Sequence, residues 1–248
     1  MQDRVALIVG ATNDVGQTIS LKLAGCGAQV VLIDSDRKNL DELATKVEAA
    51  GLKPEIVTLD PEDSNAVKAA VDTVLKKFNT IDILVNNIDH KDGVALSEGT
   101  LDTWAKSLNN NVIPVVSFCL NVIPFMRENK YGRIVNVGSL EYLGSSDHAN
   151  YSTAKSAIFG LTRSLALELA KEGITVNQVI KGDIKTSDNE MSEDVEGKIA
   201  AQTPVQRLGQ PDDIAYAVAF LAGDSCGYVT GQNLIVCGGK SVYSSMSV

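Results

Sequence analysis

Tyr151 and Lys155 form the pair of residues in this sequence that most directly suggests chemistry. They lie four positions apart in the segment YSTAK, so on a helix they would share one face. A cationic lysine beside the phenol would favour the phenolate and lower a pKa that is normally near ~10. Such a phenol can exchange a proton with a substrate oxygen near neutral pH. The alternative is an ordinary residue pair on the surface of a helix.

A glycine-rich segment near the start of the chain, IVGATNDVGQT at 8–18, resembles a phosphate-binding loop. An apolar run enters it and a helix-like segment leaves it, and the N-terminus of such a helix attracts phosphate. Asp14 stands where a glycine is expected. A carboxylate ~4 Å from a phosphate charge costs about 4 kcal/mol at an effective dielectric constant of ~20, nearly three decades in affinity. Asp14 could also be the N-cap of a helix that begins at Val15.

Asp34 is placed to recognise a ribose. It ends the second apolar run, 24 residues after Gly10. An acidic side chain at this position can accept hydrogen bonds from both hydroxyls of an adenosine ribose, and it repels a 2′-phosphate. The position therefore favours NAD over NADP, whereas the alternative is a solvated aspartate in a loop.

The elements that would position these residues alternate regularly along the chain. Helical patterns such as RKNLDELATKVEAAG and SNAVKAAVDTVLKKF separate the apolar runs. Nearly continuous Val, Ile and Leu runs separated by helices indicate a parallel sheet covered on both faces. The sequence therefore predicts an α/β fold: a single Rossmann-like, doubly wound domain over 1–248 with a seven-stranded parallel sheet. The expected strands are 5–9, 29–33, 53–59, 81–86, 132–137, 174–179 and 233–237.

The composition narrows the class of partner. Acidic residues outnumber basic ones by 31 to 22, which gives a net charge of -9, and no basic cluster offsets it. Nucleic acid and anionic membrane surfaces are therefore poor partners, and a small-molecule substrate is expected. The longest nearly apolar run, 112–125, is shorter than the ~20 residues that span a bilayer. Four widely spaced cysteines and two histidines predict reduced thiols, no metal site and a cytoplasmic location.

Several short motifs follow one another in a characteristic order. They are DILVNN at 82–87, Asn111, GRIVNVGS at 132–139, YSTAK at 151–155, GITVNQVIKGDIKT at 173–186 and the segment from Gln206 to Gly239. In this order they make the chain resemble the short-chain dehydrogenase/reductase family over essentially its whole length. The resemblance implies a nicotinamide cofactor, with NAD favoured by Asp34, and the oxidation or reduction of a secondary alcohol or ketone.

The resemblance also implies a role for particular residues. The catalytic residues would be Asn111, Ser139, Tyr151 and Lys155, with Ser139 holding the substrate oxygen and Asn111 anchoring a proton-relay water. The Ser139–Tyr151 interval is one residue shorter than the family usually shows, so the loop over the substrate is altered. The cofactor-binding residues would be Gly10, Thr12, Val15, Gly16, Asp34, Asp60, Asn87, Tyr151, Lys155 and Thr186.

The departures from the family pattern fall mainly where the dinucleotide should lie. Beside Asp14, Val9 replaces a hydroxyl that would brace the loop. The family's N-N-A-G is NNID here, so that Ile88 adds bulk and Asp89 adds charge. Lys181 replaces the proline of a P-G turn. The segment 187–196, which normally covers the substrate, holds five acidic residues and no basic one. It would cover a phosphate or carboxylate poorly, or it is a solvated helix.

Two functions remain open from the sequence. The chain could be an active NAD-dependent dehydrogenase that forms a homo-oligomer, with Asp14 turned outward. It could instead be an oxidoreductase subunit impaired in cofactor binding, or binding none, within a hetero-oligomeric dimer of dimers whose sister short-chain dehydrogenase is active. The pattern resembles the degenerate subunit of a two-subunit, 3-hydroxyacyl-CoA-type dehydrogenase of anaerobic aromatic degradation. In the family, the helices that contain Asn111 and Tyr151 would form the interfaces.

Overall fold

A seven-stranded, wholly parallel sheet forms the centre of the computed structural model, which describes residues 1–189 and 191–242. The strand order is β3-β2-β1-β4-β5-β6-β7, which confirms the doubly wound sheet that the sequence predicts. The strands are β1 (Val5–Val9), β2 (Gln29–Asp34), β3 (Glu55–Thr58), β4 (Ile83–Asn86), β5 (Gly132–Ser139), β6 (Ile174–Lys181) and β7 (Asn233–Val236). Because β1 and β4 lie at the point where the strand order reverses, a ligand crevice is expected beyond their carboxyl ends.

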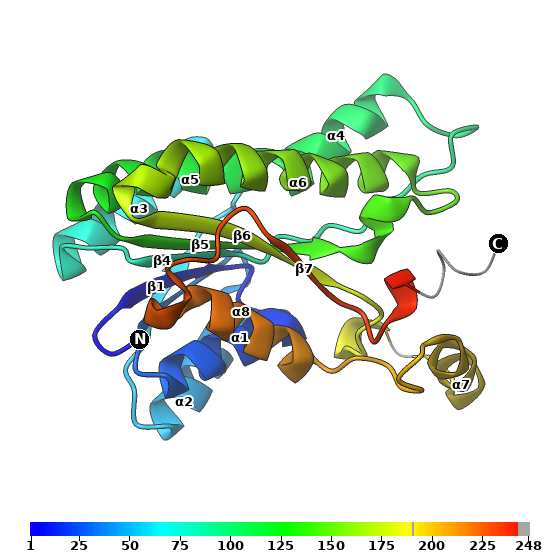
Figure 1. Cartoon of the computed structure of the whole chain (residues 1–248), viewed down its shortest axis with the longest axis horizontal. Helices are drawn as coiled ribbons and strands as arrows, with labels where there is room; N and C mark the ends of the chain where they lie inside the picture. Colours follow the sequence, from blue (N-terminus) through cyan, green and yellow to red (C-terminus); the bar gives the residue numbers. More distant parts are fainter. Residues whose placement is uncertain (190, 243–248) are drawn as a thin grey trace.

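Helices cover both faces of this sheet (Figure 1). Helices α3, α4, α5 and α6 lie on one side, and α1, α2 and α8 lie on the other, while α7 lies to one end. The helices are α1 (Asp14–Gly25), α2 (Arg37–Ala49), α3 (Ser64–Phe78), α4 (Leu101–Asn111), α5 (Ile113–Asn129), α6 (Ala149–Leu169), α7 (Glu193–Gln202) and α8 (Pro211–Ala222). Short 3-10 turns are η1 (Leu140–Leu143), η2 (Ala170–Glu172), η3 (Ser187–Asn189) and η4 (Asp224–Cys226).

The alternation of side chains along β1 explains why its sequence is apolar throughout. Ala6 and Ile8 join the core cluster beneath α1, α2 and α8. Val5, Leu7 and Val9 join the cluster beneath α3, α5 and α6. Successive residues of a strand point to opposite faces, so a strand covered on both sides has no position left for a polar side chain.

The strand ends differ slightly from the predicted ones, and the differences place polar residues at one edge. Strands β2, β5 and β6 extend to Asp34, Ser139 and Lys181. Strand β3 begins at Glu55 because Pro54 has no backbone N–H to give to a neighbouring strand. Since the carboxyl ends of parallel strands meet at one edge, these three side chains lie along the same rim of the sheet.

One helical stretch of the described residues, Leu101–Asn129, is long and apolar enough to cross a membrane by length and composition. It joins α4 to α5, and 44% of its most apolar window is buried inside the protein. Phe118, Val122 and Met126 of α5 are fully buried in the core cluster. Packing on the sheet therefore accounts for the apolar character of this stretch.

The glycine-rich loop depends on two close backbone approaches. Gly10 has a φ of +74°, and a Cβ there would overlap the carbonyl oxygen of Asn87. A Cβ on Gly16 would overlap the carbonyl oxygen of Gly10. These two glycines are thus required by the packing of α1 against β1 and β4, whether or not a ligand binds.

We expect Gly16→Ala to destabilise the isolated chain by roughly 1–3 kcal/mol, because the loop must move to relieve the overlap. The matched control is Gly160→Ala, at an exposed position of α6 where a Cβ would meet nothing within 4 Å. This change should stabilise the chain by about 0.5–1 kcal/mol. Urea denaturation monitored by circular dichroism measures both, and equal stability of Gly16→Ala and the parent chain would contradict the packing argument.

Candidate active site

Two cavities lie along the carboxyl edge of the sheet and share Asn13 and Asp89 in their walls. The first has a volume of about 330 Å³, and the second has a volume of about 420 Å³. Of the residues that the sequence selects, the second cavity collects Gly10, Thr12, Asp34, Asp60 and Asn87. The first cavity collects Val15, Ser139 and Thr186. Eight of the sequence-predicted residues therefore line the two cavities, whereas Gly16, Asn111, Tyr151 and Lys155 line neither of them.

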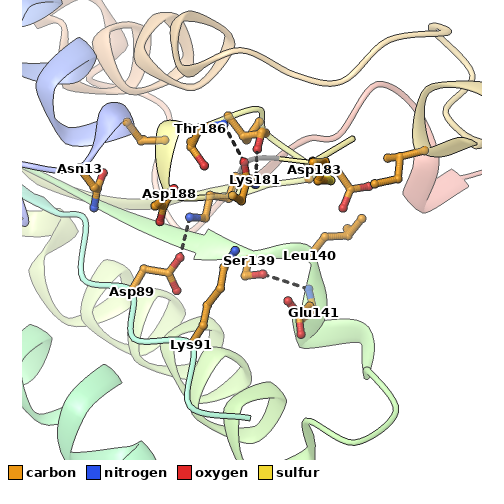
Figure 2. A pocket seen from close by; sticks show the side chains of 16 residues that line it. Asn13, Asp89, Lys91, Ser139, Leu140, Glu141, Lys181, Asp183, Thr186 and Asp188 are labelled. Atoms are coloured by element: carbon orange, nitrogen blue, oxygen red, sulfur yellow. Dashed lines mark hydrogen bonds and ion pairs between the residues drawn. The ribbon is translucent and has the colours of Figure 1, made fainter. Parts of the chain in front are cut away.

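At the junction of the two cavities, Asp89 binds the side chains of Tyr151, Lys155 and Lys181. Its Oδ1 accepts a hydrogen bond from the Tyr151 hydroxyl at 2.6 Å and pairs with Lys155 Nζ at 3.0 Å. Its Oδ2 accepts a hydrogen bond from Lys181 Nζ at 2.6 Å. Figure 2 shows Asp89 and Lys181 pointing toward each other across the cavity. Lys155 also donates to the Ile88 carbonyl oxygen at 2.8 Å.

Burial makes this cluster electrostatically strong. Tyr151 and Lys155 are 1% and 2% exposed, and the Asp89 side chain is 10% exposed. Burial opposes ionisation of Asp89, but the charges of Lys155 and Lys181 outweigh it and hold the pKa of this carboxyl well below its usual range. Burial lowers the pKa of Lys155, and Asp89 acts in the opposite direction. The replacement of the P-G proline by Lys181 therefore supplies a counter-charge to Asp89.

The prediction that Lys155 lowers the pKa of Tyr151 is wrong in this structure. Tyr151 and Lys155 do share a face of α6, with the ammonium 5.2 Å from the ring centroid. Burial nevertheless raises the pKa of Tyr151, and the charge of Asp89 and its hydrogen bond raise it further. The Ser139 hydroxyl acts in the opposite direction. Since Asp89 accepts the phenolic proton, the tyrosine is held in its neutral form and does not become the readily formed phenolate that Lys155 alone would favour.

The other two predicted catalytic residues lie close by with partners of their own. The Ser139 hydroxyl, at the end of β5, accepts a hydrogen bond from the Glu141 backbone N–H at 3.3 Å. Asn111, at the end of α4, accepts from the His90 N–H and donates to the His90 carbonyl oxygen, both at 3.0 Å. Asn111 therefore holds the chain after β4 in the conformation that directs Asp89 into the cluster.

The start of α1 requires a correction to the predicted cap. The helix begins at Asp14, and its N-cap is Asn13, whose side chain accepts from the Gly16 N–H at 2.9 Å. The Asn87 side chain donates to the Gly10 carbonyl oxygen at 2.8 Å and to Asn13 Oδ1 at 3.0 Å. Because the asparagine one position earlier already meets the helix N–H groups, Asp14 does not cap α1.

Asp14 instead binds the segment that follows β6. Its carboxylate accepts hydrogen bonds from the Ser187 backbone N–H at 2.6 Å and from the Ser187 hydroxyl at 3.1 Å. The side chain is therefore not simply turned outward, and it joins the first turn of α1 to η3. A dinucleotide would bring its pyrophosphate to this helix N-terminus. In this structure the Asp14 carboxylate stands at that end of α1, and Asp89 binds the Tyr151 hydroxyl and the Lys155 ammonium.

The remaining predicted cofactor residues are engaged in local contacts. Asp34 accepts from the Thr12 N–H at 3.0 Å and from the Thr12 hydroxyl at 2.8 Å, a use of its carboxylate that neither sequence alternative foresaw. Asp60 accepts from the Glu62 N–H at 2.9 Å, and the Thr186 N–H donates to Asn189 Oδ1 at 2.9 Å. Asp34 still lines the second cavity.

The two substitutions in NNID do different things. Ile88 is 5% exposed and joins the core cluster under α5 while bordering the second cavity, so most of its bulk is absorbed by the core. Asp89 brings a charge into the site. In the part of the chain that the structure describes, no group of three His, Cys, Asp or Glu residues is arranged to hold a metal ion. All four cysteines are free.

The pairing of Asp89 with Lys181 and that of Asp14 with Ser187 were not predicted from the sequence. The first pairing had a signal, because two departures of opposite charge follow β4 and end β6, at the same edge of a parallel sheet. Ser139, at the end of the intervening β5, is the register partner of Lys181. The second pairing had no signal, since it joins residues 173 positions apart through an ordinary serine.

Comparison with known proteins places these features in a family context. The family model described as enoyl-(acyl carrier protein) reductase matches residues 10–241. Subunit BbsC of the (2S)-[(R)-hydroxy(phenyl)methyl]succinyl-CoA dehydrogenase of Thauera aromatica is 41% identical, over 99% of this chain and 97% of the relative. Subunit BbsD of that dehydrogenase is 38% identical, over 98% of this chain and 99% of the relative.

A solved structure agrees with these matches. An actinorhodin polyketide ketoreductase variant with NADPH superposes with a TM-score of 0.91 at 31% identity, covering 97% of this chain and 99% of the ketoreductase. The relatives therefore include two subunits of one hydroxyacyl-CoA dehydrogenase, which confirms the resemblance to the two-subunit enzyme that the sequence indicated.

We expect the Tyr151 phenol to resist ionisation well above its ordinary pKa of ~10 in the parent chain and to ionise at lower pH in Asp89→Asn. Removing the carboxylate leaves the positive charges of Lys155 and Lys181 to favour the phenolate. Ultraviolet difference titration measures this, and because the chain has six tyrosines, subtracting a Tyr151→Phe variant isolates the signal. Asp147→Asn, at an exposed loop position, is the control. An unchanged or higher Tyr151 pKa in Asp89→Asn would contradict the assignment.

Proposed function

The chain belongs to the short-chain dehydrogenase/reductase family, and from that premise we propose that it is a subunit of an NAD-dependent, 3-hydroxyacyl-CoA-type dehydrogenase. In this proposal the chain is impaired in cofactor binding, and a sister subunit of the same family performs most of the turnover. The complex is a hetero-oligomeric dimer of dimers that acts on a small-molecule acyl-CoA substrate in the cytoplasm.

The observation that carries the proposal is the hydrogen bonding of Asp89. Tyr151 and Lys155 are the donors that a family member would turn toward substrate and cofactor, and here both are bound to one buried carboxylate. Lys181 neutralises part of that carboxylate's charge, so the arrangement is internally compensated. A cofactor would have to displace Asp89 from three partners before it could reach them.

The contact between Asp14 and Ser187 supports the same proposal at the other end of the groove. Phosphate binding at the α1 N-terminus would bring a negative charge against the Asp14 carboxylate. At ~4 Å and an effective dielectric constant of ~20, the repulsion is about 4 kcal/mol. The loss is nearly three decades in affinity, which is enough to turn a micromolar site into a millimolar one.

The printed names of the relatives support the acyl-CoA substrate and the sister subunit. BbsC and BbsD are both subunits of one dehydrogenase of a succinyl-CoA derivative, and this chain matches each over nearly its whole length. For the complex, NAD is favoured by the type of residue at Asp34, since a carboxylate repels a 2′-phosphate. The ketoreductase solved with NADPH shows that the other nicotinamide cofactor occurs among the structural relatives.

A second candidate function is a fully active homo-oligomeric dehydrogenase. The observation in its favour is that Ser139 and Lys181 line one cavity next to Tyr151 and Lys155, so that the residues needed for proton transfer are retained. Activity would require Asp89 to release Tyr151 when the cofactor binds. The scaffold proposal needs no such movement, and the retained tyrosine and lysine then serve as buried hydrogen-bond partners.

We expect the isolated chain to bind NAD(H) weakly and a repaired chain to bind it at least about tenfold more tightly. The repair combines Asp14→Gly, Ile88→Ala and Asp89→Gly, which removes the repulsion at both ends of the groove. Adding Lys181→Pro restores the proline of the family's turn and tests whether Lys181 itself contributes to the obstruction. Calorimetric titration of NAD(H) and NADP(H) measures affinity and preference together.

The control for this repair is Asp147→Gly, which removes an exposed carboxylate at a residue with a φ of +63° that glycine adopts without strain. Unchanged NAD(H) affinity in the quadruple variant would show that the obstruction lies elsewhere. Tighter binding of NADP(H) than NAD(H) would refute the assignment of Asp34.

For the assembled enzyme, we expect Tyr151→Phe in this chain alone to leave turnover essentially unchanged. The substitution removes only the hydroxyl that donates to Asp89, while the sister subunit keeps its own catalytic residues. Size-exclusion chromatography of the purified complex checks that assembly survives, and steady-state kinetics measure turnover. If turnover collapses although the complex remains intact, this chain is catalytic and the active-dehydrogenase alternative is correct.

A further inference from the structure

We propose that the Asp14 carboxylate holds a flap closed over the 330 Å³ cavity. The flap comprises residues 183–189 and 191–202, which follow β6 and include η3 and α7. Because the contact lies within the chain, closure does not depend on a ligand, and release of the contact is expected to open the cavity. The proposal concerns access to the cavity and is independent of the cofactor or substrate that the chain binds.

The flap supplies one wall of this cavity, and the start of α1 supplies part of another. Thr186, Met191 and Ile199 line the cavity from the flap, and Asn13 and Val15 line it from α1. Figure 2 shows Asn13 and Thr186 beside the cavity. A movement of the flap away from α1 would therefore widen the cavity.

One side chain joins these two walls directly. Asp14 Oδ2 accepts a hydrogen bond from the Ser187 backbone N–H at 2.6 Å, and its Oδ1 accepts one from the Ser187 hydroxyl at 3.1 Å. Both carboxylate oxygens thus bind one residue and fix η3 against the first turn of α1. The N-terminal end of a helix favours a negative charge, so α1 stabilises the carboxylate in this place. The glycine expected at position 14 would have no side chain to accept either bond.

Few other polar contacts attach the flap to the rest of the protein. At its start, the Lys185 N–H donates to the Gly209 carbonyl oxygen at 2.9 Å, and beyond its end the Val205 N–H donates to the Gly238 carbonyl oxygen at 3.2 Å. Between these points, among the described residues 186–189 and 191–202, Ser187 alone has a hydrogen bond or ion pair with a residue outside 184–206.

Helix α7 adds little to this attachment. None of its residues is buried, and Figure 1 shows it at one end of the molecule, apart from the helices that cover the sheet. Its Glu196 pairs with Lys185 inside the flap. The acidic part of α7 thus fits the solvated helix that the sequence allows for the segment 187–196, in which Glu190 lies outside the described residues.

The contact of Asp14 with Ser187 is therefore expected to control how often the flap opens. Segments with few buried apolar contacts open locally at a low cost in free energy, far below that of global unfolding. In such a segment, a pair of hydrogen bonds to a carboxylate is a large part of what favours the closed form. Removing the carboxylate then shifts the population toward the open form.

The experiment is limited trypsin digestion of the isolated full chain, with cleavage after Lys185 and Lys198 followed by mass spectrometry. Cleavage of a transiently opened segment follows the population of the open form when opening and closing are fast. We expect Asp14→Ala to raise the rate of cleavage about tenfold. In an Ile199→Cys background, N-ethylmaleimide labelling of the introduced thiol should accelerate by a similar factor, because that position lines the cavity.

Three further variants assign the effect to the contact. Ser187→Ala loses the hydroxyl but keeps the backbone N–H, so cleavage should accelerate only about threefold. Asp14→Ala combined with Ser187→Ala should be cleaved as fast as Asp14→Ala, because both changes act through one contact. Asp212→Ala is the matched control, since it removes an exposed carboxylate from the first turn of α8 and should change nothing.

Unchanged cleavage and labelling in Asp14→Ala would overturn the proposal, as would an equal acceleration in Asp212→Ala. If Asp14→Ala fails to fold, unchanged cleavage in Ser187→Ala would overturn it instead, since Ser187 is exposed. None of these measurements uses NAD(H), a sister subunit or turnover. Tight NAD(H) binding would refute the impaired-subunit function and leave the result on the flap standing, and the converse also holds.

Discussion

The pairing of one buried carboxylate with two lysines and a tyrosine is the interaction on which the chemistry of this protein depends. Asp89 accepts the hydrogen bond of the Tyr151 hydroxyl, and the ammonium groups of Lys155 and Lys181 together hold the carboxylate in its ionised form. A buried ion pair of this kind adds little net stability compared with apolar packing, but breaking it by removing one partner is costly. Its main effect is therefore on which protonation states and ligands the site accepts.

The fold was readable from the sequence because β1 and the middle of β2 are apolar on both faces and the other apolar runs alternate with helical patterns. Strand β1, for example, has no polar position, and the cores above and below the sheet explain why. The placement of Asp34 and Ser139 at strand ends was also predictable, since the change from apolar to polar residues marks the rim of a parallel sheet. What the site residues would touch was less predictable. Lys181 reaches Asp89 past β5, a contact that depends on strand order, side-chain length and the turn after β4 together.

The first turn of α1 shows how small a difference can change an assignment. Asn13 and Asp14 are both good N-cap residues, and the choice between them depends on a one-residue shift of the helix start. The Asn87 amide, which donates to Asn13 Oδ1, favours Asn13 as the cap. Asp14 is then left one position inside the helix and meets Ser187, from a segment distant in sequence. Hydrophobic patterns and helix propensities describe neighbouring residues only, so they could not predict that Asp14 contacts Ser187.

The mutual dependence of Asp89 and Lys181 also constrains how the chain can evolve. Replacing Lys181 alone would leave Asp89 with less counter-charge, and replacing Asp89 alone would leave two lysines facing each other near the protein interior. Removal of one partner of a buried pair typically costs about 3–5 kcal/mol, a large part of the ~5–15 kcal/mol that stabilises a folded domain. A return to the family's glycine and proline at these positions therefore passes through a less stable intermediate unless both codons change together. The two substitutions are therefore epistatic, because either reversal alone lowers stability. Selection for stability then preserves the altered site.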